Sequence, residues 1–313
     1  MIYILLALMI GLMMPIQTAV NSRLRTYVLS PFMASFISFL VGTIFLFIMT
    51  LATKHSVLIP FTVFQNNPFW IWLGGLLGVI GLTTNILLFP KLGGVQTVVL
   101  PIMGQIMMSM LIDHFGLFFS PEKSFSLLRL VGIIILILGV FCVIVLPDYL
   151  RKKQIGIESS IDSVNKLPLQ IAGIVAGMLM ASQSAINGHL GGLLHSAVHA
   201  AFVSFLVGTS ILFILVTIVY RQLGNFKFAL GKDKPIWIWC GGILGAFFVL
   251  IMAYLVPIIG TGLVVVICLF GQILCSVLID TFGLIGAKKA PITRIQVLGL
   301  VLLFIAVVFI RLF

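Results

Sequence analysis

The sequence predicts an all-α integral membrane protein with ten transmembrane helices, arranged as two inverted five-helix repeats. Three observations predict this fold class. Of the 313 residues, 61% are apolar and only 8% are charged, with a mean hydropathy of +1.30, so too few polar side chains remain to cover a surface in water. The chain also contains ten long apolar runs, and blocks of its first half recur in its second half.

The apolar runs have the length of membrane spans. A hydrocarbon core about 30 Å thick requires roughly 20 apolar residues of helix. We expect helices close to the ranges 3–24, 31–53, 69–88, 94–112, 127–146, 169–190, 198–220, 236–256, 262–279 and 295–312.

The recurring blocks indicate an internal duplication. Their offset is nearly constant, at 166 or 167 positions. Three pairs illustrate it: Gln17 with Gln183, Asn21 with Asn187, and segment 104–116 with segment 271–283. Because each copy holds an odd number of helices, the second copy must cross the membrane in the opposite sense to the first. The halves should therefore be related by a pseudo-two-fold axis in the membrane plane.

The domain organisation follows from the position of the single long polar stretch. Residues 1–147 form the first five-helix repeat, residues 148–168 form a polar linker, and residues 169–313 form the second, inverted repeat. In this topology fourteen of the eighteen lysines and arginines fall on the linker side. The positive-inside bias then places the linker in the cytoplasm and both termini outside. We expect a multi-pass protein of the bacterial inner membrane.

Polar residues inside the predicted helices are the candidates for a binding site, because such side chains are costly in a bilayer unless they are paired or face a cavity. In an inverted repeat, four of these helix faces can converge on one pocket between the halves. The predicted substrate-binding residues are Gln17, Asn21, Asn85, Gln105, Ser109, Gln183, Asn187, Gln272 and Ser276. Asn85 is singled out because its counterpart is Met252, so it could mark the side on which substrate binds.

Each of these residues also has a structural interpretation. A buried amide often joins two helices, with a contribution of about 1 kcal/mol, and duplication preserves such packing contacts too. Asp113 and Asp280 lie at the ends of two equivalent helices. They are predicted to act as paired gates, each closing one mouth by meeting a cation or a backbone donor. The alternative is that each carboxylate simply anchors a helix end at the membrane interface.

The sequence also disfavours several functional classes. No carboxylate falls near the middle of a predicted span, which disfavours proton-coupled transport of organic cations and favours a neutral, zwitterionic or weakly polar substrate. Walker A, G-x-S-x-G and HExxH motifs are missing, so we expect no enzymatic activity. We expect no cofactor and no metal site, since His195 and His199 lack a third ligand nearby. The basic residues punctuate the apolar runs, so we expect no nucleic-acid partner.

The chain resembles the drug/metabolite transporter superfamily, and within it the bacterial YdcZ-like branch. The resemblance rests on the ten predicted helices, the mirrored amides and the paired G-Q-I-x-x-S-x-L-I-D-x-F-G blocks. The resemblance implies a central cavity surrounded by the first, third and fourth helices of each repeat, with the fifth helices peripheral. It also implies that Gln17, Asn21, Asn85, Gln105, Gln183, Asn187 and Gln272 face this cavity. Ten-helix relatives usually keep their termini in the cytoplasm, whereas the charge distribution here favours the reverse.

The function most consistent with these features is secondary transport, probable export, of a small metabolite by alternating access of the two halves. The alternatives are a flippase for a lipid or lipid-linked substrate, and a membrane receptor or assembly factor that transports nothing. The expected partners are the small-molecule substrate and membrane lipids, with a homodimer left open.

Overall fold

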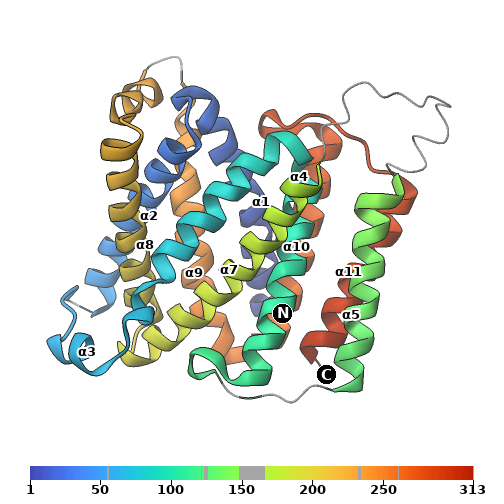
Figure 1. The fold of residues 1–313 in the computed structure, drawn as a ribbon, viewed down its shortest axis with the longest axis horizontal. Coiled ribbons are helices and arrows are strands. Elements are labelled where there is room, and N and C mark those ends of the chain that lie inside the picture. The colour runs from blue at the N-terminus through green and yellow to red at the C-terminus, as the bar shows by residue number, and fades with distance from the viewer. Residues whose placement is uncertain are drawn as a thin grey trace.

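The computed structural model describes residues 1–54, 56–120, 122, 126–147, 166–231, 234–259 and 261–312. All regular elements within these ranges are helical (Figure 1). Seven helices are long and apolar enough to cross a membrane, which confirms the predicted class of α-helical membrane protein. The predicted linker, 148–168, lies outside the described residues except for its last three positions.

In the first half of the chain, the described residues form five α-helices and three short segments of other helical types. In order they are α1 (Ile2–Val28), α2 (Pro31–Lys54), α3 (Phe61–Asn66), the 3-10 turn η1 (Phe69–Trp72), α4 (Gly74–Phe115), the 3-10 turn η2 (Leu117–Phe119), and α5 (Leu127–Val140) with its π-helical extension η3 (Phe141–Val145).

The second half follows the same order. It consists of α7 (Leu167–Leu193), α8 (Ala197–Ile214) with its π-helical extension η4 (Leu215–Val219), the 3-10 segments η5 (Leu223–Ala229) and η6 (Ile236–Trp239), α9 (Cys240–Ile259), α10 (Thr261–Phe282), η7 (Leu284–Gly286) and α11 (Arg294–Leu312).

Helix α4 covers most of two predicted spans. It is 42 residues long, which at 1.5 Å per residue is about 63 Å, twice the thickness of a hydrocarbon core. Predicted spans 69–88 and 94–112 therefore meet in one element, which is broken at Gly93 (φ 83°, ψ 173°), a conformation that glycine adopts without a Cβ clash. The predicted spans 236–256 and 295–312 correspond to η6 with α9 and to α11.

Helices α2 and α8 meet at residues that are equivalent in the two repeats. The hydroxyl oxygens of Thr43 and Thr209 lie 2.7 Å apart, and the ring centroids of Phe39 and Phe205 lie 5.0 Å apart. Both pairs are separated by 166 positions, the offset of the duplication. A residue can contact its own equivalent only close to a two-fold axis, so a pseudo-two-fold axis passes between these two helices.

The ring contacts along α2 and α8 also give the relative direction of the two helices. Phe32, at the start of α2, stacks on Tyr220, just after η4. Phe47, fifteen residues further along α2, instead contacts Phe202 near the start of α8. Contacts that advance along one helix while they recede along the other mean that α2 and α8 run antiparallel.

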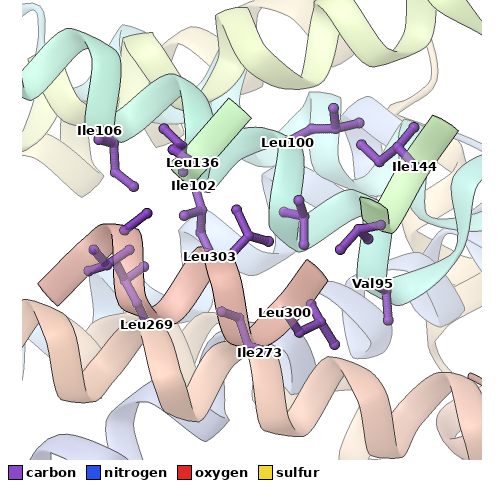
Figure 2. Packing of buried hydrophobic residues seen from close by; sticks show 14 of the residues in the cluster. Val95, Leu100, Ile102, Ile106, Leu136, Ile144, Leu269, Ile273, Leu300 and Leu303 are labelled. Carbon is purple, nitrogen blue, oxygen red and sulfur yellow. The ribbon is translucent and has the colours of Figure 1, made fainter. Parts of the chain in front are cut away.

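The largest apolar core lies between the second half of α4 and helices α5, α10 and α11. Figure 2 shows side chains of this cluster, among them Ile102 of α4, Leu136 of α5 and Leu303 of α11, all at most 1% exposed. Helices α5 and α11 pack against each other at one end of the bundle (Figure 1). Helices α4 and α10 contribute both to this core and to the predicted site, whose remaining residues lie on α1 and α7.

Candidate functional site

The amides of α1 lie in the contact between α1 and α9. Asn21 is fully buried, and its Nδ2 donates a hydrogen bond to Ser38 Oγ of α2 at 3.1 Å. A Cβ atom placed on Gly241 of α9 would collide with Asn21 Oδ1, and one placed on Gly245 would collide with Gln17 Nε2. The two α1 amides therefore pack against the Cα atoms of two glycines, which lets α1 and α9 approach closely.

The amides of α7 repeat this arrangement against the first half of α4. Asn187 Nδ2 donates to Ser204 Oγ of α8 at 3.2 Å, and a Cβ atom on Gly74 would collide with Asn187 Oδ1. Gln183 packs against Gly78 in the same way. We call the two contacts the α1/α9 seam and the α4/α7 seam. Each seam joins the first helix of one repeat to the third helix of the other.

Three asparagine oxygens are buried without a hydrogen-bond donor among the described residues: Asn21 Oδ1, Asn85 Oδ1 and Asn187 Oδ1. The oxygens of Asn21 and Asn187 are in contact with glycine, and a Cα–H group is only a weak donor. An unsatisfied buried carbonyl costs about 1–3 kcal/mol. These oxygens would therefore gain from a ligand N–H or O–H group, as would the unpaired buried oxygens Gln96 Oε1 and Gln222 Oε1.

Asn85 has different surroundings from its counterpart. It is 8% exposed, and its Nδ2 lies 4.0 Å from Met180 Sδ of α7, a weak contact. The equivalent position, Met252, lies 3.7 Å from Cys268 Sγ. The two repeats therefore differ chemically at this level, because the amide of Asn85 is replaced by the thioether of Met252.

The predicted site residues of α4, Gln105 and Ser109, can be compared with their equivalents on α10, Gln272 and Ser276. Ser109 and Ser276 both donate to a backbone carbonyl of their own helix, at 3.0 and 2.8 Å, which is a common way to satisfy a serine hydroxyl inside a helix. Gln105 and Gln272 are both half-buried. However, Ser276 is fully buried, whereas Ser109 is half-buried.

Asp280 is the best-connected acidic group in the described part of the chain. Its carboxylate accepts hydrogen bonds from the backbone N–H groups of Gly94 and Val95, at 2.7 and 2.8 Å. These N–H groups begin the second half of α4, immediately after the break at Gly93. A carboxylate is favourable at this position because it satisfies N–H groups that lack a helical partner and complements the positive end of the helix dipole.

The contact at Asp280 matches one form of the predicted gate, in which the carboxylate meets a backbone donor. Asp113, its equivalent in the first repeat, is half-buried near the end of α4. The backbone equivalent to Gly93 is residue 260, which lies outside the described residues. Gating by either residue stays a prediction.

Two of the histidines, His199 and His189, contact residues outside their own helices. His199 is 5% exposed; its backbone N–H is capped by Ser196 Oγ, and its Nε2 lies 3.2 Å from the carbonyl oxygen of Val57. His189 packs against Phe119 and Trp70, with ring centroids 4.9 and 5.5 Å apart. The described residues contain no group of three histidine, cysteine or acidic side chains placed to hold a metal ion.

The glycine partners of the amides were not among the predicted site residues. Gly74 and Gly241 occupy equivalent positions next to a repeated Trp-Ile-Trp segment, so the recurrence was a usable signal. Which helix each glycine faces depends on how the halves are packed. The bonds from the backbone N–H groups of Gly94 and Val95 to Asp280, 186 and 185 positions later in the sequence, could likewise not be predicted, because local sequence patterns do not report contacts between distant segments.

Comparisons with known proteins place the chain in a family. The family model described as "Putative inner membrane exporter, YdcZ" matches residues 2–142 and again residues 169–309, one match for each copy. A solved structure described as "Crystal structure of protein" has a TM-score of 0.56 and 14% sequence identity, and the match covers 98% of both chains, which shows a shared fold. No curated protein matches the chain.

The two family matches cover nearly all of the chain outside the linker, and the helices have the length and hydropathy of membrane spans. Both findings identify a multi-pass protein of the inner membrane with a transport function. The chain belongs to the YdcZ family of inner-membrane exporters, within the drug/metabolite transporter superfamily.

Proposed function

We propose that the protein exports a small neutral, zwitterionic or weakly polar metabolite by alternating access. Two inverted five-helix halves, residues 1–147 and 169–313, would rock about the pseudo-two-fold axis between α2 and α8. The halves of α4 on either side of Gly93 would count as two spans, and α9 and α11 would complete ten. The charge distribution supports a cytoplasmic linker and outward termini.

The observation that carries this proposal is the duplicated seam. The first helix of each repeat crosses the third helix of the other repeat, with the same amides facing the same glycines. Two equivalent contacts of this kind allow one half to tilt against the other while each retains a close approach. The buried asparagine oxygens at the seams supply acceptors for a polar but uncharged cargo group.

The chemistry of the seams supports an uncharged or zwitterionic cargo. The amide and hydroxyl groups of Gln17, Asn21, Asn85, Gln183 and Asn187 carry no net charge. Such groups offer both donors and acceptors, and they do so without the desolvation cost of an isolated ion in a bilayer.

A transport screen in proteoliposomes tests the proposal. The native chain is compared with the double variant Gln17→Ala, Gln183→Ala, and with Gln65→Ala, a matched control on the exposed surface of α3. We expect flux of a soluble metabolite by the native chain and by Gln65→Ala, and reduced flux by the double variant.

Three other outcomes would contradict parts of this proposal. Normal flux by the double variant would show that these glutamines serve packing alone. Translocation of a labelled lipid without solute flux would show that the protein is a flippase and not a solute carrier. If neither solute nor lipid moves, a receptor or assembly factor is the better interpretation.

A further inference from the structure

Residues that are equivalent in the two repeats differ in burial, and the difference is concentrated at one end of the molecule. Thr18 and Ser22 of α1 are 8% and 5% exposed. Their equivalents on α7, Ser184 and Gly188, are both exposed. Since the residues in each pair are small in both repeats, side-chain size does not explain the difference.

Helices α4 and α10 show the same asymmetry. Cys275 and Asp280 of α10 are 6% and 5% exposed, whereas their equivalents Met108 and Asp113 of α4 are half-buried. In both comparisons the more buried member lies in the C-terminal half of its helix, in α1 or α10. These two half-helices pack side by side, and Ile16 of α1 lies against the buried cluster that contains Cys275 of α10.

A compact apolar plug fills the space where the C-terminal halves of α1 and α10 meet α4. Its residues are Ala19 of α1, Phe89 of α4, and Cys275 and Ile279 of α10, none more than 6% exposed. The Asp280 carboxylate, one residue beyond Ile279, bonds to the start of the second half of α4. This bond fastens α10 to α4 beside the plug.

The opposite end of the molecule lacks this degree of closure along α7. A Cβ atom added to Gly188 would have no described atom within 4 Å. The exposed positions Ser184 and Gly188 directly follow the seam amides Gln183 and Asn187 in the sequence. In contrast, the exposed face of α5 consists of large apolar side chains such as Ile134 and Ile137, as expected for contact with lipid. Helix α7 exposes large apolar side chains such as Ile171 and Val175 only in its N-terminal half, and its exposed positions near the seam amides are the small residues Ser184 and Gly188.

We propose that this structure is the conformation in which the mouth at the linker end is shut and the opposite mouth is open along α7. The closed gate consists of the plug formed by Ala19, Phe89, Cys275 and Ile279, fastened by the Asp280 carboxylate. Cargo reaches the seam amides from the side of the chain termini. This inference rests on the alternating access proposed above, and it assigns its two gates.

Thiol labelling tests the assignment without any knowledge of the cargo. In a chain whose four cysteines are replaced by alanine, single cysteines are introduced as Ser184→Cys and as Thr18→Cys, the equivalent position. A membrane-impermeant maleimide is added to right-side-out and to inside-out vesicles. Lys166→Cys, exposed at the start of α7, identifies the linker face independently of the predicted orientation.

We expect the Ser184→Cys thiol to be labelled from the face opposite the linker, and at least roughly tenfold faster than the Thr18→Cys thiol from either face, because a buried thiol reacts only after local opening. An unlabelled Ser184→Cys thiol, as for a residue facing lipid, would overturn the open mouth. Labelling of Thr18→Cys from the linker face at the rate of the Lys166→Cys reference would overturn the closed gate.

The fastening by Asp280 is tested with Cys275 as the only cysteine. Asp280→Asn keeps the size of the side chain and removes the charge, and we expect faster labelling of Cys275 from the linker face. Unchanged labelling in a chain with native secondary structure would refute the role of this carboxylate. Solute flux combined with an unlabelled Ser184→Cys thiol would refute only the gate assignment. The expected labelling without any flux would instead refute the proposed transport.

Discussion

The close contact between Asn21 and Gly241 leads to a quantitative prediction for Gly241→Ala. The added Cβ would overlap Asn21 Oδ1 and lie 2.8 Å from its Cγ, so the fully buried amide must move. Overpacking of this kind costs about 1–3 kcal/mol. Loss of the 3.1 Å bond from Asn21 to Ser38 adds about 1 kcal/mol, and the higher helix propensity of alanine returns about 1 kcal/mol.

The expected net loss in the free energy of unfolding is therefore about 1–3 kcal/mol. Gly188→Ala is the matched control, because its Cβ would meet no described atom within 4 Å. We expect this control to be neutral or to gain up to about 1 kcal/mol. Reversible unfolding in mixed micelles, followed by far-ultraviolet circular dichroism, measures both variants.

A double-mutant cycle separates the proposed contact from a general effect on the helix. In an Asn21→Ala background the obstructing amide is gone, so Gly241→Ala should no longer be destabilising. The reasoning is refuted if Gly241→Ala is as stable as Gly188→Ala, or if its cost persists unchanged when Asn21 is alanine.

Three further predictions concern other bonds between or within the halves. Asp280→Ala leaves two backbone N–H groups unpaired and should lower the free energy of unfolding by about 2–3 kcal/mol; a value near zero would show that water replaces the carboxylate. Thr43→Val and Thr209→Val should each cost about 1 kcal/mol, and the double variant should cost little more than either alone, since both remove the same 2.7 Å bond; full additivity would contradict the pairing. Thr293→Ala removes the two bonds of the Thr293 hydroxyl at the start of α11, one to Gln296 Oε1 and one from the Gln296 backbone N–H, 3.1 and 3.2 Å long, and should lower stability by about 1 kcal/mol, measured by the same unfolding titration; an unchanged midpoint would argue against the cap.

Much of the fold could be predicted because it is encoded by local composition. A run of about 20 apolar residues favours a spanning helix wherever it occurs, and predicted range 31–53 agrees closely with Pro31–Lys54. The count of separate spans was less predictable. Hydropathy does not reveal that two predicted spans follow each other within α4, separated only by the bend at Gly93.

The candidate site was predictable in its residue types more than in its contacts. Gln17 and Asn21 were identified as one helix face, and the structure places them together against α9. Their partners in the other half could not be predicted, because contacts across about 220 positions depend on the packing of whole helices. Whether these amides bind cargo or only join helices stays a prediction that the flux measurement tests.

The sequence by itself determined that this is a helical membrane protein made of two related halves, since hydropathy and recurrence are properties of the chain alone. Only the tertiary structure decided which glycine each amide meets, and that Asp280 binds the start of the second half of α4. It also decided which end is more tightly packed. The two repeats have similar sequences, so local preference cannot decide which of two equivalent positions is more deeply buried. The choice depends on the sum of contacts in one conformation, where Cys275 is buried and its equivalent Met108 is not.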